Sequence, residues 1–440
     1  MIRAWCGKAL RLPIVFWIRV AFGIGASERI DVMEAFFRKA RASGFVACAG
    51  VVCLALAACS QPVNHRPLSA ADFQETSLQE IFEDRFWGDE LPPNFEERVS
   101  ENARLLSERY PGGKDPISGK DPYSRLLAIS GGGANGAFGA GVLAGWTESG
   151  KRIEFDVVTG VSTGAIIAPF AFLGPDYDEI ILAIYASGAR EDVFDLTFLG
   201  GLLFGSGVAD TAPLRRQIEN HVTLELIEAI AEEHEKGRDL YIITTHFDAR
   251  RPVVWNVGAI AARRDQEAVR LIRKIIQAST AIPVFFPPVP IEFELGERTF
   301  TELHVDGGLS HSVFAYPSQI PVARMDEMLG VNFRREIYLI VNSNKQTRYD
   351  PAPTGTLSIA GRAVRTLLQN QLNADVERIF RVSRRDGIAF KMISIPESFE
   401  ATGSTDFDSD YMQALLDVGK GIGRTGAFWR DRPYSIGPEE

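Results

Sequence analysis

Two glycine-rich turns, each lying between a short apolar run and a helix-like run, constrain the fold of this chain more than any other feature. The first turn, 131–136 (GGGANG), follows the apolar run 125–130 and opens the helical pattern 136–149. The second turn, 160–164 (GVSTG), follows 155–160 and opens 163–173. Strands that alternate with helices in this way predict an α/β fold with a mostly parallel sheet covered on both faces.

The same alternation continues towards the C-terminus. Further strands are expected at 239–245, 300–305, 337–342 and 388–395, and further helices near 176–186, 223–236, 265–277, 357–380 and 409–419. Before the sheet, Asn94 can cap a helix whose apolar residues Phe95, Val99, Ala103 and Leu106 share one face. We expect 59–124 to form a tether and an N-terminal arm that packs on the main domain.

The second turn has the pattern G-x-S-x-G, with Ser162 between Gly160 and Gly164. A serine on a strand-to-helix turn adopts a strained conformation that exposes its hydroxyl, and the flanking glycines remove side chains that would collide there. The helix N-terminus behind it favours negative charge. The pattern therefore predicts a nucleophile elbow, while the simpler alternative is a serine that caps a helix after a glycine turn.

The first turn leaves the backbone N–H groups of Gly131, Gly132 and Gly133 available to bind an anion. In an ester hydrolase that anion is the tetrahedral oxyanion. The same residues also satisfy G-x-G-x-x-G, so a dinucleotide-binding oxidoreductase is an alternative. That alternative requires an acidic residue at the end of the second strand, whereas Asp156 lies at its start and the strand ends in the elbow.

A serine nucleophile needs a base, and the expected strand 301–305 runs directly into Asp306-Gly307-Gly308. The carboxyl edge of the sheet is where α/β enzymes place catalytic groups. An Asp-Gly pair also marks ordinary turns. Taken alone, Asp306 would therefore be interpreted as a turn residue.

The glycine loop, the G-x-S-x-G elbow and the D-G-G element, in this order, resemble the patatin-like phospholipase family. The similarity extends over 126–308 and includes the segments 210–214 (DTAPL), 245–248 (THFD) and 278–288. The resemblance implies a three-layer α/β/α sandwich and a catalytic domain at 125–440 with a C-terminal extension. It also implies a Ser162 and Asp306 dyad without histidine, an oxyanion hole at Gly131 to Gly133, and hydrolysis of lipid acyl esters without a cofactor. Asn135 stands where the family usually has Arg or Lys, which puts a cationic role there in doubt.

The N-terminal region resembles a bacterial lipoprotein signal. An uncharged apolar run, 45–58, follows three basic residues at 38–41 and ends in LAAC at 56–59. We expect 1–58 to be a signal region with its true start at Met33, and Cys59 to be the lipidated first residue of the mature protein. Ser60 favours the outer membrane, facing the periplasm or the cell surface. The alternatives are a buried core helix at 45–58 and a membrane segment at 12–26, which Pro13 and Arg19 disfavour.

Composition and charge argue against two other classes of protein, those that bind nucleic acid and those that bind a metal ion. The net charge of -10 provides no basic face for nucleic acid. All four cysteines lie within the first 59 residues and the six histidines show no H-E-x-x-H pattern, so no metal is expected. Membrane lipids or other lipid esters are the expected partners. A lipid-binding lipoprotein that keeps the fold without turnover is the non-enzyme alternative.

Overall fold

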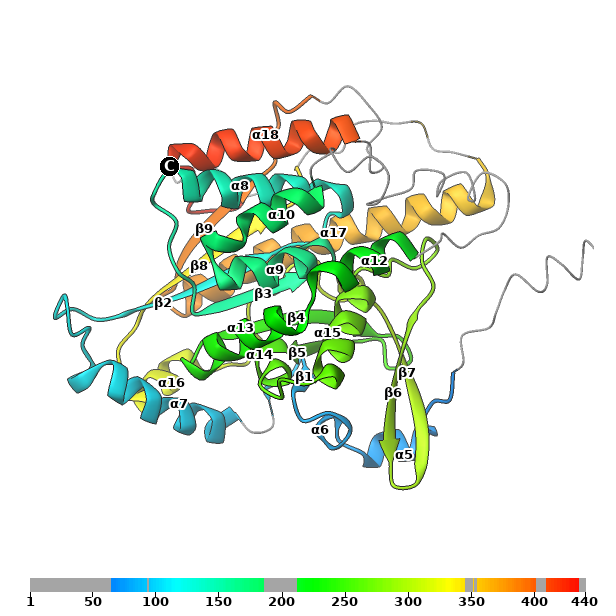
Figure 1. Ribbon diagram of the computed structural model, residues 1–440, viewed down its shortest axis with the longest axis horizontal. Helices are drawn as coiled ribbons and strands as arrows, with labels where there is room; N and C mark the ends of the chain where they lie inside the picture. Colours follow the sequence, from blue (N-terminus) through cyan, green and yellow to red (C-terminus); the bar gives the residue numbers. More distant parts are fainter. Residues whose placement is uncertain are drawn as a thin grey trace, which may run out of the picture. The chain divides into compact units, whose positions relative to one another are not determined.

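A nine-stranded sheet with strand order β1-β5-β4-β3-β2-β8-β9, and with a β6-β7 branch paired to β4, organises the computed structural model (Figure 1). The structure describes residues 65–92, 95–185, 212–344, 351, 354–400 and 409–434. The strands are β1 (Arg85–Trp87), β2 (Tyr123–Ile129), β3 (Val157–Val161), β4 (Asp239–His246), β5 (Arg251–Asn256), β6 (Val289–Leu295), β7 (Arg298–Asp306), β8 (Arg334–Val341) and β9 (Ala389–Ser394).

The centre of the sheet is parallel, as the alternating pattern predicts. Strands β4, β3, β2, β8 and β9 run in one direction, whereas β1, β5, β6 and β7 pair antiparallel with their neighbours. The sequence patterns did not predict β1, β5 and β6. Strand β1 is only three residues long, and β5 and β6 contain Pro252 and Pro290, which weaken a strand signal.

Helices cover both faces of the sheet, so the three-layer α/β/α sandwich is confirmed (Figure 1). Alternate residues of β2 face opposite cores: Leu127 and Ile129 enter one, and Ala128 enters the other. The larger core lies under α8 (Gly136–Glu148), α9 (Thr163–Leu173), α10 (Asp178–Tyr185), α12 (Ala212–His221), α13 (Leu224–Glu235), α14 (Val257–Ala261), α15 (Gln266–Ser279) and α18 (Ser409–Thr425). The opposite core lies under α16 (Val322–Leu329) and α17 (Thr356–Arg385).

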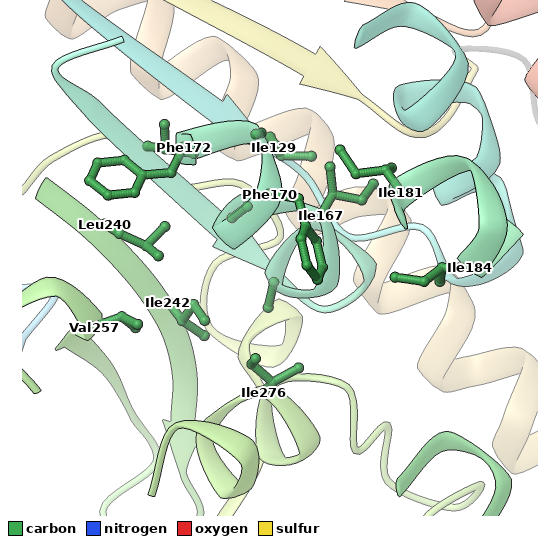
Figure 2. Packing of buried hydrophobic residues seen from close by; sticks show 14 of the residues in the cluster. Ile129, Ile167, Phe170, Phe172, Ile181, Ile184, Leu240, Ile242, Val257 and Ile276 are labelled. Carbon is green, nitrogen blue, oxygen red and sulfur yellow. The ribbon is translucent and has the colours of Figure 1, made fainter. Parts of the chain in front are cut away.

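The larger core is built from aliphatic and aromatic side chains of strands and helices that are distant in sequence. Figure 2 shows Ile167 and Phe170 of α9 among Ile242 of β4 and Ile276 of α15. These side chains are almost fully excluded from solvent. Burying a side chain of this size contributes about 1.5–3 kcal/mol, so the packing holds the elbow helix α9 firmly against the sheet.

Before the central strands, the chain forms the short helices α5 (Ala70–Glu75) and α6 (Leu78–Ile81) and the longer α7 (Phe95–Arg109). The helix expected from 95 onwards is confirmed, since Phe95 and Val99 of α7 are buried against Leu329 of α16. Its expected cap, Asn94, lies outside the described residues.

The C-terminal helix α18 packs on α8 with almost no side chain between the two backbones. An added Cβ at Gly141 of α8 would overlap the carbonyl oxygen of Leu416, and one at Gly145 would overlap that of Lys420. Gly419 of α18 would in turn overlap the carbonyl oxygen of Phe138. Glycine at these positions is therefore a packing requirement.

Residues 1–64 and 186–211 lie outside the described residues. The expectations for Met33, for the run before Cys59 and for the first two residues of the segment 210–214 consequently stay predictions. Among the residues that the structure describes, no helix is both long enough and apolar enough to cross a bilayer.

Candidate active site

The ends of β3 and β7 meet on one flank of β4. Strand β3 pairs with the first part of β4, up to the pair Val161 and Ile243. Strand β7 pairs antiparallel with the last part of β4, and its final residue Asp306 is opposite Thr244. Because Ile243 and Thr244 are consecutive, the two strands approach each other end to end. This topology brings Ser162, the residue after β3, next to Asp306.

Ser162 has the backbone conformation of a nucleophile elbow. Its φ of 54° and ψ of -124° lie in a region that non-glycine residues rarely adopt. Its N–H donates to Ser279 Oγ at 2.9 Å, and Ser279 Oγ donates to the carbonyl of Ile243 at 2.7 Å. An added Cβ at Gly160 would overlap the carbonyl of Gly164. The strained turn is thus held by α15 and by close backbone packing.

Ser162 and Asp306 form a direct hydrogen bond. Ser162 Oγ donates to Asp306 Oδ2 at 2.7 Å, and the N–H of Gly308 donates to Asp306 Oδ1 at 2.7 Å. Both residues are buried, with 6% and 1% of their surfaces exposed. Burial raises the pKa of Asp306 to about 7, although these two hydrogen bonds act to lower it. A carboxyl with this pKa can exchange protons near neutral pH, which a general base requires.

The glycine loop lies against the serine. An added Cβ at Gly131 would approach Ser162 Cβ to 3.2 Å. However, the N–H of Gly131 donates to the carbonyl of Ser312 at 2.9 Å, so the predicted donor role of Gly131 does not fit this conformation. Within the described part of the chain, no acceptor is recorded for the N–H groups of Gly132 and Gly133. These two amides follow Gly131, the loop residue that packs on Ser162, and they are the candidate oxyanion donors.

Comparison with known proteins relates the segment that carries this site to a known family. The family model described as patatin-like phospholipase matches residues 127–317, a segment that contains the glycine loop, the elbow and Asp306. The chain carries a patatin-like phospholipase domain. The cUMP-AMP-activated phospholipase of Escherichia coli is 43% identical over 72 residues, which cover 14% of this chain and 20% of that protein. The structure of VipD from Legionella pneumophila matches with a TM-score of 0.30 and 12% identity over 68% of each chain.

Asn135 of the patatin-like domain is part of the structural frame of the glycine loop. Its side-chain oxygen accepts a hydrogen bond from the hydroxyl of Tyr411 on α18 at 2.8 Å. At this position, where the resemblance leads us to expect a cationic side chain, the neutral amide of Asn135 forms a hydrogen bond to the C-terminal helix α18.

Two residues that the sequence did not single out also hold the glycine loop. Asn342, after β8, donates through Nδ2 to the carbonyl of Ser130 at 3.0 Å, and its Oδ1 accepts from the N–H of Gly139 at 3.1 Å. Asp375 of α17 accepts from the N–H of Ser312, whose carbonyl binds Gly131. Their only sequence signals were a polar residue at a strand end and an acidic residue within a helix.

The two histidines nearest to Asp306 in the sequence make their hydrogen bonds with groups other than Ser162 and Asp306. His304 lies two residues before Asp306, but its ring nitrogens contact Thr244 Oγ1 at 2.9 Å and Glu302 Oε2 at 3.1 Å. Burial lowers the pKa of His304 to about 4. His311 Nδ1 lies 3.2 Å from Asp375 Oδ1. In the part of the chain that the structure describes, no cluster of three or more His, Cys, Asp or Glu side chains is placed to hold a metal ion.

Proposed function

We propose that this protein hydrolyses acyl esters of lipids, as a phospholipase A or a lysophospholipase, through Ser162 and Asp306. The observation that carries the proposal is the 2.7 Å hydrogen bond between Ser162 Oγ, on a strained strand-to-helix turn, and the buried carboxylate of Asp306. The family of the domain and the phospholipase named for the Escherichia coli relative support the substrate class.

In the proposed acylation step, Asp306 Oδ2 removes the hydroxyl proton while Ser162 Oγ attacks the ester carbonyl carbon. The amides of Gly132 and Gly133 stabilise the resulting oxyanion. A donor of this kind contributes roughly 3–4 kcal/mol to the barrier reduction. When the tetrahedral intermediate collapses, Asp306 returns the proton to the leaving alcohol and an acyl-serine remains.

The proposed deacylation step uses the same groups. Asp306 removes a proton from a water molecule that attacks the acyl-serine, and the tetrahedral intermediate again places its oxyanion on the two amides. Collapse releases the fatty acid and returns a proton to Ser162 Oγ. One carboxylate thus serves both half-reactions, so no histidine is required.

Labelling with a fluorophosphonate probe separates this hydrolase from a lipid-binding protein without turnover. We expect stoichiometric labelling at Ser162 and release of fatty acid from mixed phospholipid vesicles. Ser162→Ala and Asp306→Asn should abolish both. A folded Asp306→Asn protein with normal labelling and turnover would rule out the dyad. Lipid binding by the unmutated protein without any labelling would favour the non-catalytic alternative.

We also propose that Cys59 carries a lipid that anchors the protein to a bacterial membrane, and that the outer membrane is its destination. The support is the basic flank, the apolar run 45–58 and the small residues before the cysteine. Cys59→Ser should block processing or release the protein from the membrane fraction. Mass spectrometry that finds an unmodified Cys59 within an intact N-terminus would contradict this proposal.

A further inference from the structure

A cleft of about 390 Å³ lies between the end of α17, the start of β9 and the segment 429–432. Four cationic residues line it, namely Arg384, Lys391, Arg430 and Arg432, together with the aromatic residues Phe380, Phe390 and Trp429. The carboxylate in its lining is that of Asp431. Pockets of this size accommodate one small molecule.

The cleft lies away from the dyad. Strand β9 is at the edge of the sheet and runs parallel to β3 through β8 and β2. Residues 389–391 of the cleft lie at the start of β9, whereas Ser162 follows the end of β3. In a parallel sheet the starts and the ends of strands lie at opposite edges, so the cleft is a separate site.

The cations of the cleft are only partly neutralised. Lys391 Nζ is 3.9 Å from Glu336 Oε1, and Arg432 Nε is 3.1 Å from Asp431 Oδ1. No ion pair is recorded between Arg384 or Arg430 and any described residue. In a protein with a net charge of -10, this local excess of positive charge favours an anionic ligand.

The walls of the cleft are held by backbone and ring contacts. Arg430 and Met392 of β9 exchange two backbone hydrogen bonds, of 2.9 and 2.8 Å, and the Arg430 guanidinium lies 4.0 Å from the centre of the Tyr434 ring. The Trp429 ring packs edge-on against Tyr338 at 4.9 Å. The indole N–H is buried and has no recorded acceptor among the described residues. The backbone beside Arg430 is therefore fixed, with the Phe390 side chain in the core under α17 and the Trp429 ring in the opposite core.

We propose that this cleft binds a phosphate-bearing molecule, with Arg384 and Arg430 as the principal phosphate ligands. Guanidinium groups bind phosphate through paired hydrogen bonds in a fixed planar geometry. Phe380 and Phe390, whose ring centres are 5.1 Å apart on the α17 face, accommodate an apolar or planar part attached to the phosphate. A phospholipid headgroup and a soluble phosphate compound share this chemistry, and the test below distinguishes them. The proposal does not depend on the hydrolase activity.

The test uses the full chain with Ser162→Ala, so that probes are not consumed. Inorganic pyrophosphate is titrated by calorimetry, and vesicles of phosphatidylglycerol and of phosphatidylcholine are compared by sedimentation. The double variant Arg384→Gln with Arg430→Gln removes the two lining cations that form no ion pair with a described residue. Arg381→Gln is the matched control, because Arg381 is an exposed cation of α17 that pairs with Glu377 outside the cleft.

We expect the double variant to bind at least about tenfold more weakly than the control, which corresponds to the loss of one charge-assisted contact or more. Pyrophosphate binding that depends on the two arginines identifies a soluble phosphate compound. Arginine-dependent binding of phosphatidylglycerol vesicles alone identifies a lipid headgroup. If neither probe binds, or if the double variant binds as tightly as Arg381→Gln, the proposal is wrong.

Discussion

At the scale of single residues, the burial of Asp306 sets the pH range in which the proposed dyad can act. Because the pKa of Asp306 is about 7, the fraction of ionised base falls as the pH drops below neutrality. We expect kcat/KM for a soluble short-chain ester to decrease about tenfold for each pH unit below 6. His304→Ala should leave this profile unchanged, since the pKa of His304 is about 4 and its ring contacts other groups. A flat profile between pH 5 and 8, or a folded His304→Ala protein without activity, would contradict the dyad.

The same buried carboxyl lowers the stability of the native protein at neutral and alkaline pH relative to acidic pH. A folded pKa raised above the ordinary 3.8 means that the native state favours the protonated form, so this contribution to stability is lost as the pH rises towards 7. The difference between the folded and the ordinary pKa of Asp306 corresponds to about 4 kcal/mol of unfolding free energy at most. Asp306→Asn should therefore raise the free energy of unfolding at pH 8 but not at pH 4, while activity falls by about three orders of magnitude or more. Urea denaturation at both pH values measures this, and an equal change at both would refute it.

At the scale of elements, the contact between α8 and α18 depends on glycine. In Gly141→Ala the added methyl group overlaps the backbone carbonyl of Leu416, so the helices must separate. Overpacking of this kind costs about 1–3 kcal/mol. Gly421→Ala on α18 is the control, because its added Cβ meets no atom within 4 Å and alanine favours the helix by about 1 kcal/mol. Thermal denaturation should show a lower Tm for the first variant and an equal or higher Tm for the second. A decrease in Tm of similar size in both variants, or an increase in both, would contradict the packing argument.

At the scale of the whole molecule, a buried ion pair ties the N-terminal arm to the strand that carries Asp306. Arg85 of β1 donates to both carboxylate oxygens of Glu302 on β7, at 2.5 and 2.9 Å, and both side chains are buried. Arg85→Met leaves an uncompensated charge and should destabilise the protein by about 3–5 kcal/mol. Arg85→Met with Glu302→Gln should recover most of this loss. Chemical denaturation of the two variants checks the expectation, and a double variant no more stable than the single one would contradict it.

The proposed mechanism also predicts how the activity of the whole protein responds to metal chelators. The proposed mechanism uses a carboxylate and backbone amides, and neither needs a metal ion. Turnover of phospholipid should therefore be unchanged in EDTA. Activity that is lost in EDTA and restored by Ca²⁺ would show that a further component takes part.

The sequence by itself determined the local features of the site. A serine between Gly160 and Gly164 after an apolar run predicts a strand, a strained turn and a helix, because each of these depends on neighbouring residues only. The parallel centre of the sheet followed from the same local alternation. An aspartate after the run 301–305 predicted a polar group at a strand end, but not the direction of that strand.

The tertiary structure decided what depends on pairing between distant segments. Ser162 and Asp306 are 144 residues apart, and they meet because β7 runs antiparallel along the part of β4 that β3 leaves free. The hydrogen bond from the Gly131 N–H to the Ser312 carbonyl could not be predicted either. No local sequence pattern indicates which distant carbonyl group packs against a loop. Long-range strand register and burial set these contacts, and with them the raised pKa of Asp306, so only the folded chain contains that information.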